Sequence, residues 1–434
     1  MIPSLKDYIK KSDYIKNILT LMTGTTISQI IPIVMSPVFS RIYRPEDFGV
    51  LALFMSFVGI LSVIAAGRYD LAIMLPKDDK EAINIIVFSL IIVLSFSIAV
   101  FIGIIVFNNS IVIFLKNEDI KSWLFFVPLC VFITGIFQVF NFWYSRKKQF
   151  KLISVARVTH AAGTVATRLG LGLAGFKPGG LIVSTVLGQS IASVMLVRKF
   201  FKEQKYEKIF IFKKDLLYQA KNHSDFPKYS VPIALLDVFS QQVPILMITR
   251  LFTISVVGLY SFAYRILNLP MTFIGTSVSQ VFYQKFSDTI KYGENGINVI
   301  IKTWIGLAAV GFVPLFVIFL FGENIFAFVF GANWGEAGKI ASILSPMVLL
   351  TFVSSPTSTA YAVLRIQHIG LIFGAIVFVY RPLTFYIGSI FDNIYIGLKI
   401  LVILETIQTF CYNLVVFTKI KNEYKRIYIE LKNK

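Results

Sequence analysis

Four polar side chains share one face of an otherwise apolar segment, residues 152–176. They are Arg157, His160, Thr164 and Arg168, separated by three, four and four residues. Such spacings bring side chains onto a single stripe of an α-helix, with the two arginines about 16 Å apart along its axis. A basic stripe in an apolar segment requires either an acidic partner helix or an aqueous cavity that anions can enter.

Other ionisable residues also fall within apolar segments. Arg265 and Arg381 are further cations, and Asp70, Asp237 and Glu405 are the acids that could pair with them. Each charge at depth costs roughly 2.5–3.5 kcal/mol on insertion scales, so positions facing lipid are disfavoured. The surplus of deep arginine favours an anionic ligand such as phosphate or pyrophosphate, which arginine binds through two parallel hydrogen bonds.

Structural explanations of these charges stay open beside the functional one. Arg157 lies near the start of its segment and could extend to the membrane surface. Arg381 precedes Pro382 and could serve only a kink, with its guanidinium satisfying the freed carbonyl groups. Asp237 and Glu405 could be structural ion-pair partners of an arginine.

The elements that would position these residues are membrane spans. The chain is 56% apolar and 15% charged, with a mean hydropathy of +0.74. Segments of this length and composition predict an all-α polytopic membrane protein. About 12 spans are expected, at 17–40, 47–75, 82–107, 123–144, 152–176, 179–197, 229–249, 256–284, 297–321, 340–364, 369–390 and 394–417.

The distribution of Lys and Arg predicts the topology. With a cytoplasmic N-terminus, the cytoplasmic loops and tails hold 30 of the 42 basic residues and the outer loops hold 7. This asymmetry places both termini in the cytoplasm. The net charge of +19 lies in short loops between spans, so it reports topology and gives no reason to expect a nucleic-acid partner.

Two halves of six spans each are expected. Residues 1–198 form one bundle, residues 199–228 a basic cytoplasmic linker, and residues 229–434 a second bundle with a cytoplasmic tail. Arg41–Gly49 is echoed by Arg250–Gly258, 209 residues later, at the same point of each hydropathy pattern. The echo indicates internal repeats related by a pseudo-two-fold axis along the membrane normal. We interpret the first stretch as a break between helices at Pro45 and Gly49.

The sequence contains no motif of a soluble enzyme. There is no phosphate-binding P-loop, no zinc-protease HExxH and no glycine-rich dinucleotide turn. Cys130 and Cys411 both lie in apolar spans, and the three histidines have no partners at metal-ligand spacing. We therefore expect no enzyme activity, no cofactor and no metal, and transport driven by an ion gradient or by the substrate gradient.

Three stretches carry a resemblance to a known family. They are Gly24–Gly49, which includes the run RIYRPEDFG, then Gly67–Pro76 (GRYDLAIMLP) and Trp143–Lys151 (WYSRKKQFK). They resemble the polysaccharide transporters, the O-antigen or Wzx-type flippases of the MOP superfamily. The resemblance spans the whole chain in length and span count, although its sequence signatures lie mostly in the first 190 residues.

This resemblance implies two six-helix bundles around a central cavity, alternating between the two faces of the bacterial inner membrane. The implied substrate is an oligosaccharide repeat unit on undecaprenyl pyrophosphate, moved to the periplasmic leaflet for O-antigen or another surface polysaccharide. By this resemblance Arg157, Arg168, Arg265 and Arg381 become candidates for pyrophosphate binding. A polysaccharide polymerase and chain-length proteins are the implied partners.

A coupled ion is a further expectation. Return of the empty carrier could require H⁺ or Na⁺, for which Asp237 and Glu405 are the candidate sites. Three alternatives remain. They are a MATE-like multidrug or cation antiporter of the same superfamily, a membrane glycosyltransferase, polymerase or ligase acting on the same lipid-linked sugars, and a scaffold that does not transport. The basic stripe disfavours the antiporter, because cationic drugs require an acidic cavity.

Overall fold

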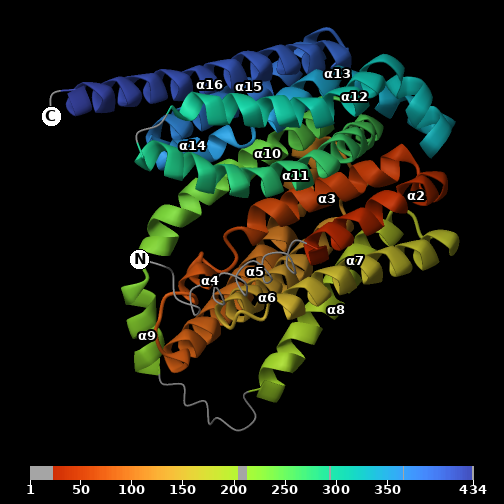
Figure 1. Ribbon diagram of the computed structural model, residues 1–434. Helices are drawn as coiled ribbons and strands as arrows, with labels where there is room; N and C mark the ends of the chain where they lie inside the picture. Colours follow the sequence, from red (N-terminus) through yellow and green to blue (C-terminus); the bar gives the residue numbers. More distant parts are fainter. Residues whose placement is uncertain (1–22, 204–212, 293–294, 365, 433–434) are drawn as a thin grey trace. The chain divides into compact units, whose positions relative to one another are not determined.

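The computed structural model describes residues 23–203, 213–292, 295–364 and 366–432 (Figure 1). Within these ranges every regular element is helical, which confirms the predicted all-α class. The chain divides into two compact units, Met1–Arg250 and Leu251–Lys434. The first six residues of the predicted span 17–40 and part of the predicted linker 199–228 lie outside the described residues.

The first unit is built mainly from long helices joined by short turns. In chain order it contains a helix at residues 23–34, α2 (Ser36–Ile42), α3 (Pro45–Ser62), α4 (Tyr69–Ala72), α5 (Asp79–Leu115), η1 (Trp123–Phe126), α6 (Val127–Arg146), α7 (Phe150–Leu173), α8 (Gly179–Glu203), α9 (Lys213–Asn222), η3 (Phe226–Ser230) and α10 (Val231–Leu251).

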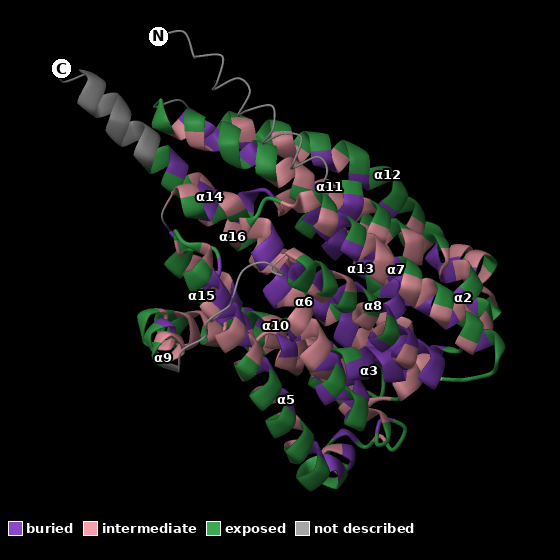
Figure 2. Ribbon diagram, turned by 90° about the horizontal axis from the view of Figure 1, so that it is seen from below, coloured by how far each residue is buried: buried purple, intermediate pink, exposed green. Residues whose placement is uncertain are grey.

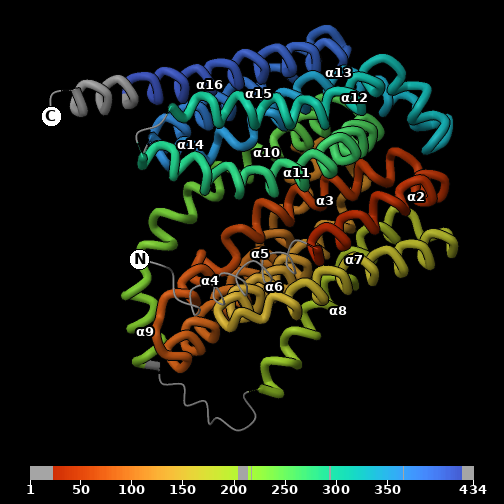
Figure 3. Tube along the Cα trace, viewed as in Figure 1, coloured from red at the N-terminus to blue at the C-terminus, as the bar shows by residue number. Residues whose placement is uncertain are grey.

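The second unit repeats this arrangement of long antiparallel helices. It contains α11 (Ile254–Lys291), α12 (Gly296–Phe330), η4 (Ala332–Trp334), α13 (Gly335–Ser354), α14 (Thr357–Val363), α15 (Gln367–Ile390) and α16 (Ile394–Lys432). Consecutive helices lie side by side along the trace: α11 with α12, α12 with α13, and α15 with α16 (Figure 3).

Apolar side chains on the outside of α5 and α12 explain why these helices need lipid around them. Both helices carry many exposed aliphatic and aromatic residues, and Figure 2 colours much of their length as exposed. Exposed apolar surface on this scale is unfavourable in water and is satisfied by a bilayer. At 37 and 35 residues, α5 and α12 are also longer than the roughly 20 residues that cross a hydrocarbon core.

Nine helical stretches among the described residues are long and apolar enough to cross a membrane, and each overlaps a predicted span. The predicted spans without such a match are 17–40, 152–176 and 256–284. The last two form continuous helices, α7 and α11. We attribute their lower apolar character to their polar stripes, which contain Arg157, Arg168 and Arg265. The count of twelve is consistent with this structure and stays a prediction.

Small residues allow the closest helix contacts in each unit. In the first unit, a side chain at Gly188 of α8 would collide with Thr164 of α7. In the second unit, a side chain at Gly322 of α12 would collide with the backbone of Gly338 on α13, and the reverse is also true. Close backbone approach at small residues is a common way for helices to associate in membranes.

The echoed Arg-to-Gly stretches are both junctions between helices, as the sequence predicted. Helices α2 and α10 end at Ile42 and Leu251, which are 209 residues apart. Helices α3 and α11 begin at Pro45 and Ile254, which are also 209 residues apart. The repeat is therefore visible in the backbone, with two residues between helices at each junction.

Capping hydrogen bonds stabilise the first turn of the new helix at both junctions. At the first, the backbone N–H of Arg44 donates to Asp47 Oδ2 at 2.9 Å, and Pro45 occupies the first helical turn. At the second, Thr253 Oγ1 accepts a hydrogen bond from the N–H of Val256. Gly49 lies inside α3 and not at the break, so the break depends on Pro45 and the cap.

The boundary between compact units differs from the predicted division of the chain. The sequence places α10 at the start of the second half, whereas the first unit extends to Arg250, at the end of α10. Arg250 contributes to this assignment, because its guanidinium donates to the carbonyl oxygen of Phe114 and lies 5.1 Å from the Phe114 ring centroid. The grouping into six helices plus six stays a prediction.

Candidate functional site

Arg168 is deeply buried between α7 and α8, with 5% of its surface exposed. Its Nε donates to Ser184 Oγ and its Nη2 to Thr185 Oγ1, each at 3.2 Å. The guanidinium carbon lies 5.5 Å from the ring centroid of Phe39 on α2. These three partners are neutral and belong to neighbouring helices, so they hold Arg168 within the bundle of the first unit. Its predicted contact with pyrophosphate stays a prediction.

The stripe of α7 therefore serves packing along part of its length. Thr164 lies against Gly188 of α8, where no side chain could fit. His160, one turn away, is half-buried. No cluster of three or more His, Cys, Asp or Glu side chains with metal-binding geometry occurs among the residues that the structure describes.

Arg157 occupies the other end of the stripe and is only half-buried. Its Nη1 donates to Thr25 Oγ1 at 2.6 Å, which ties α7 to the helix at residues 23–34. A hydroxyl partner leaves the positive charge uncompensated, because threonine carries none. Arg157 therefore keeps the capacity to attract an anion.

Arg381 and Glu405 form an ion pair between α15 and α16. Arg381 Nε and Glu405 Oε1 are 2.7 Å apart, and their side chains are 22% and 12% exposed. Tyr380 on α15 donates to Gln408 Oε1 on α16, one turn beyond the acid. The structure thus brings together one predicted cation and one predicted ion-coupling acid, which satisfies the structural alternative that the sequence left open.

Asp237 is exposed on α10, and its Oδ1 accepts a hydrogen bond from Gln241 Nε2 at 3.3 Å. This contact joins two side chains of the same helix face, as the sequence predicted for a polar face of this span. No ion pair of Asp237 occurs within the described part of the chain. A role in coupling to H⁺ or Na⁺ stays a prediction.

Arg265 differs from the other predicted arginines because its side chain is exposed. It lies eleven residues into α11, about 17 Å from the start of the helix. No hydrogen bond or ion pair connects it to the residues that the structure describes. A guanidinium at mid-span is costly against lipid, so a position facing lipid is disfavoured.

A hollow lies between α11, α13 and the start of α14, and its lining on α11 begins at Asn268, three residues after Arg265. Its volume is about 450 Å³. Arg265 shares a helix face with the α11 residues that line it, because they follow at helical spacing. The lining contains no charged residue, and its polar members are Asn268, Thr272, Thr276, Ser279, Gln280, Thr351, Ser355 and Ser358.

Several hydroxyl groups that line this hollow already donate a hydrogen bond to a backbone carbonyl group. Thr272 Oγ1 donates to the carbonyl of Asn268 at 2.8 Å, and Ser355 Oγ donates to that of Phe352 at 2.8 Å. Thr276 and Ser358 make the same kind of bond within their own helices. A hydroxyl has one hydrogen and two lone pairs, so these oxygens can serve a ligand only as acceptors. The hollow is therefore complementary to a ligand rich in hydroxyl donors.

Sequence reasoning found Arg265 and missed the residues beside it. Arg265, Asn268, Thr272 and Thr276 are separated by three, four and four residues, the same spacing as in the stripe from Arg157 to Arg168. The spacing rule applied to α7 would have found this second stripe. It was missed because uncharged Asn and Thr attract less attention than arginine and because α13, which completes the hollow, lies far along the chain.

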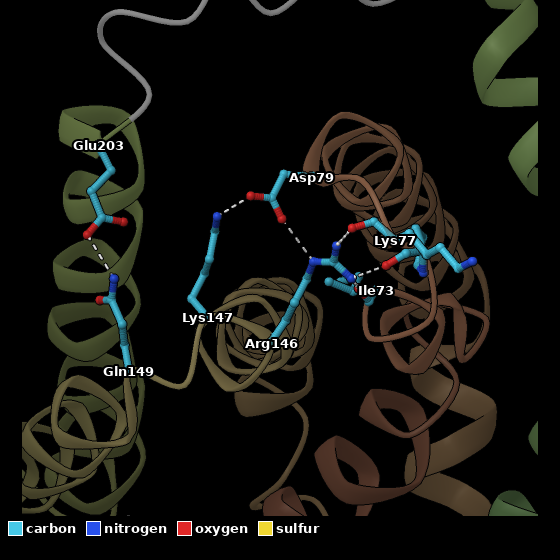
Figure 4. Close-up of polar contacts among 8 residues, drawn as sticks. Ile73, Lys77, Asp79, Arg146, Lys147, Gln149 and Glu203 are labelled. Carbon is cyan, nitrogen blue, oxygen red and sulfur yellow. Dashed lines mark hydrogen bonds and ion pairs between the residues drawn. The ribbon is translucent and has the colours of Figure 1, made fainter. Parts of the chain in front are cut away.

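Two of the stretches that carried the family resemblance meet in one contact (Figure 4). Arg146, the last residue of α6, donates to Asp79 Oδ1 at 3.1 Å, to the carbonyl of Lys77 at 3.0 Å and to that of Ile73 at 3.4 Å. Lys147 forms a second ion pair with Asp79. The run around Arg146 thus holds the turn that follows GRYDLAIMLP.

Comparison with known proteins identifies a family. The profile of a family described as "Polysaccharide biosynthesis protein" matches residues 38–339, well over half of the chain. No curated protein matches the chain in sequence.

Solved structures share the fold at low sequence identity. The lipid II flippase MurJ in an inward closed conformation aligns with a TM-score of 0.74 and 13% identity, covering 95% of this chain and 90% of MurJ. An inward-facing multidrug resistance MATE transporter of the MOP superfamily aligns with a TM-score of 0.69 and 16% identity, covering 94% and 95%. A MOP superfamily transporter from Pyrococcus furiosus, described as having a binding pocket of reverse polarity, aligns with a TM-score of 0.51 and 15% identity, covering 94% of this chain and 96% of that transporter. With the fold of these transporters and the profile match along most of its length, this chain belongs to the polysaccharide biosynthesis protein family of multi-pass membrane proteins.

Proposed function

We propose that this protein is a flippase for lipid-linked oligosaccharides. Its substrate is an oligosaccharide repeat unit on undecaprenyl pyrophosphate, moved from the cytoplasmic to the periplasmic leaflet of the bacterial inner membrane. The product serves assembly of O-antigen or another surface polysaccharide. The protein works as a transporter and not as an enzyme, by alternating access.

The observation that carries this proposal is an exposed Arg265 on the same face of α11 as the residues that line an uncharged, hydroxyl-rich hollow, which begins one helical turn further along. A guanidinium at mid-span attracts a pyrophosphate and can bind it through two parallel hydrogen bonds. The adjacent oxygens of Thr272, Thr276 and Ser355 accept hydrogen bonds, which sugar hydroxyl groups donate. One face of α11 therefore offers both kinds of contact that a sugar pyrophosphate needs.

The four predicted arginines take different roles in this proposal. Arg265 has no competing partner in the described residues, so it is the first candidate for the pyrophosphate. Arg157, held by one neutral hydroxyl, is the second. Arg168 and Arg381 are bonded to neighbouring helices, so in this proposal they mainly stabilise the helix packing around Arg157 and Arg265.

The two candidate acids for ion coupling, Glu405 and Asp237, differ in their partners. Glu405 is committed to Arg381, so protonating it would leave a deep cation without its partner. Asp237 is exposed and has only the Gln241 contact, which makes it the better candidate for H⁺ or Na⁺ coupling. A polysaccharide polymerase and chain-length proteins would receive the product on the other side of the membrane.

A multidrug or cation antiporter is the runner-up function, and the lining of the hollow disfavours it. Cationic drugs require acidic or aromatic side chains to compensate their charge. Among the residues that line the hollow, none is acidic and Phe352 is the only aromatic. For the Pyrococcus furiosus transporter, a binding pocket of reverse polarity is likewise taken to suggest a different function within this superfamily.

A complementation experiment tests the proposal. A strain that lacks its own flippase, but makes a matching repeat unit, receives the wild type, Arg265→Gln, Arg265→Lys or Lys199→Gln at matched protein levels. We expect the wild type to restore surface polysaccharide and Arg265→Gln to reduce it roughly tenfold or more, because a hydrogen bond to a charged group contributes about 1.5–3 kcal/mol. Arg265→Lys should restore an intermediate level of surface polysaccharide. Lysine keeps the positive charge but cannot form the two parallel hydrogen bonds of a guanidinium.

Lys199→Gln is the matched control, because it removes an exposed positive charge at the end of α8, where Lys199 pairs with Glu203. Polysaccharide restored equally by Arg265→Gln and by the control would refute the role of Arg265. A wild-type protein that restores no polysaccharide, although the repeat unit is present, would refute flipping itself.

A further inference from the structure

A second hollow in the same unit has the opposite hydrogen-bonding character. It lies between α11 and α12, near the turn that joins them, and has a volume of about 620 Å³. Lys285 of α11 and Lys302 of α12 line it. Each lysine lies six residues from the adjoining helix end, so both are about 9 Å from the turn.

The polar end of this hollow offers donors. Neither lysine takes part in an ion pair within the described residues. Asn295 accepts the N–H of Ile297 through its side-chain oxygen at 3.0 Å, which leaves its amide N–H₂ group available. Two ammonium groups and an amide donor favour an anion, and phosphate oxygens accept several hydrogen bonds at once.

The other end of the hollow is apolar. Ile274 and Val278 of α11 and Leu307 and Val310 of α12 line it, about 7–17 Å from the lysine of the same helix along its axis. Gly306 leaves this part open, because a side chain there would meet nothing within 4 Å. The adjacent outer surface of α12 is also apolar, so a hydrocarbon chain could pass from the hollow into the surrounding lipid without contacting water.

The two hollows lie on different faces of α11. Residues of α11 that line this second hollow are rotated by about 100° from those that line the hollow near Arg265, at 100° per residue. A ligand bound here would therefore not occupy the proposed sugar site. The turn between α11 and α12 falls on the side where the charge distribution places the cytoplasm.

We propose that this hollow binds an anionic membrane phospholipid from the cytoplasmic leaflet. Lys285 and Lys302 hold the lipid phosphate, the amide of Asn295 adds a hydrogen bond, and one acyl chain lies between α11 and α12 along Gly306. The bound lipid fills the gap between the two helices on their lipid-facing side. This site is separate from the proposed flippase site and does not depend on it.

Lipid retention by the purified protein tests this site without any transport. The protein is reconstituted in equal amounts of phosphatidylglycerol and phosphatidylcholine, extracted in mild detergent, and its retained lipid is counted by native mass spectrometry. We expect the wild type to retain phosphatidylglycerol preferentially. The double variant Lys285→Gln/Lys302→Gln should retain at least fivefold less, and Gly306→Leu should lower retention by filling the groove.

Two control variants match these changes. Lys199→Gln/Lys202→Gln removes two charges at the end of α8, and Gly374→Leu adds the same bulk at a glycine of α15 that also has open space around it. The site is refuted if the wild type shows no preference for phosphatidylglycerol, or if the test and control variants retain it equally.

Two further arms test which ligand occupies the site. Adding 10 mM inorganic phosphate should leave retention unchanged, because phosphate lacks the hydrocarbon chain. Displacement by phosphate would overturn the lipid assignment in favour of a free-anion site. Undecaprenyl phosphate retained in preference to phosphatidylglycerol would overturn the choice of a bulk phospholipid.

Discussion

Arginines that look alike in the sequence differ in the structure, in side-chain exposure and in hydrogen-bond partners. Arg168 and Arg265 are both single cations in apolar spans, yet one is 5% exposed between two helices and the other is exposed at mid-span. Hydrogen bonds to Ser184 and Thr185 fix the first, so its removal would leave a polar gap in the packing between α7 and α8. Arg265 makes no hydrogen bond or ion pair with the described residues, so no such contact fixes its guanidinium.

A buried carboxyl group gives a prediction of pH dependence. The sequence places Asp70 within the predicted span 47–75, whereas in the structure it lies beyond the end of the membrane-length stretch Pro45–Ser62. Asp70, in the short helix α4, is 2% exposed, and its Oδ1 has no hydrogen-bond partner in the described residues. Burial raises the pKa of Asp70 above its ordinary value, and nearby Arg68 only partly opposes this shift. A raised carboxyl pKa means that ionised Asp70 costs folding free energy, and this cost grows as pH rises from the unfolded-state pKa through the folded-state pKa.

Asp70→Asn should therefore unfold at a higher temperature than the wild type at pH 7. The gain should be smaller at pH 4 than at pH 7, because the wild-type carboxyl group becomes protonated as the pH falls. Thermal unfolding of the detergent-solubilised protein at both pH values measures the difference. A gain that is equal at pH 4 and pH 7 would show that the charge of Asp70 is not the cause.

At the scale of elements, the contact around Arg146 joins α6, α5 and the turn before α5. One guanidinium serves the carbonyl groups of Ile73 and Lys77 and the carboxylate of Asp79 (Figure 4). Its side chain is 11% exposed, and of its acceptors Ile73 is buried whereas the Asp79 side chain is 43% exposed. The fork of arginine reaches them together, which a single ammonium group cannot do.

Arg146→Ala should lower the free energy of unfolding by about 1–3 kcal/mol, since it removes the donor to the carbonyl group of buried Ile73 and one of the two ion pairs that Asp79 forms within the described residues. Arg146→Lys should recover less than half of this loss. Lys151→Ala is the control, because Lys151 is exposed at the start of α7 and does not take part in this contact. Equal thermal unfolding of Arg146→Ala and Lys151→Ala would contradict the proposed role.

At the scale of the whole molecule, the distribution of positive charge predicts which loops face the cytoplasm. Lys80 lies at the start of α5 and Glu118 in the loop after it, and both residues are exposed. In a background without Cys130 and Cys411, a cysteine at Glu118 should react with a membrane-impermeant maleimide in cells with a permeabilised outer membrane. A cysteine at Lys80 should react only after the inner membrane is disrupted. The reverse pattern would invert the topology.

Much of the fold was readable from the sequence, for physical reasons. A bilayer demands long apolar helices, so the spans were visible as apolar runs and nine of them correspond to helices of membrane-spanning length. Proline and capping residues act locally, so the junctions at Pro45 and Ile254 could be located from the repeat. Helix lengths were less predictable, because α5, α11, α12 and α16 extend well beyond the apolar core of their spans.

The sequence by itself determined which residues are costly to bury in a membrane: Arg157, Arg168, Arg265, Arg381, Asp237 and Glu405. Charge, helical spacing and hydropathy are properties of the chain, so they needed no structure. Only the tertiary structure decided what each charge faces. The partner of Arg381 lies 24 residues away and those of Arg168 lie 16 and 17 residues away, each on another helix. Such pairings depend on how helices rotate against one another, and the uncharged hollow that begins one helical turn beyond Arg265 exists only because α13 packs against α11.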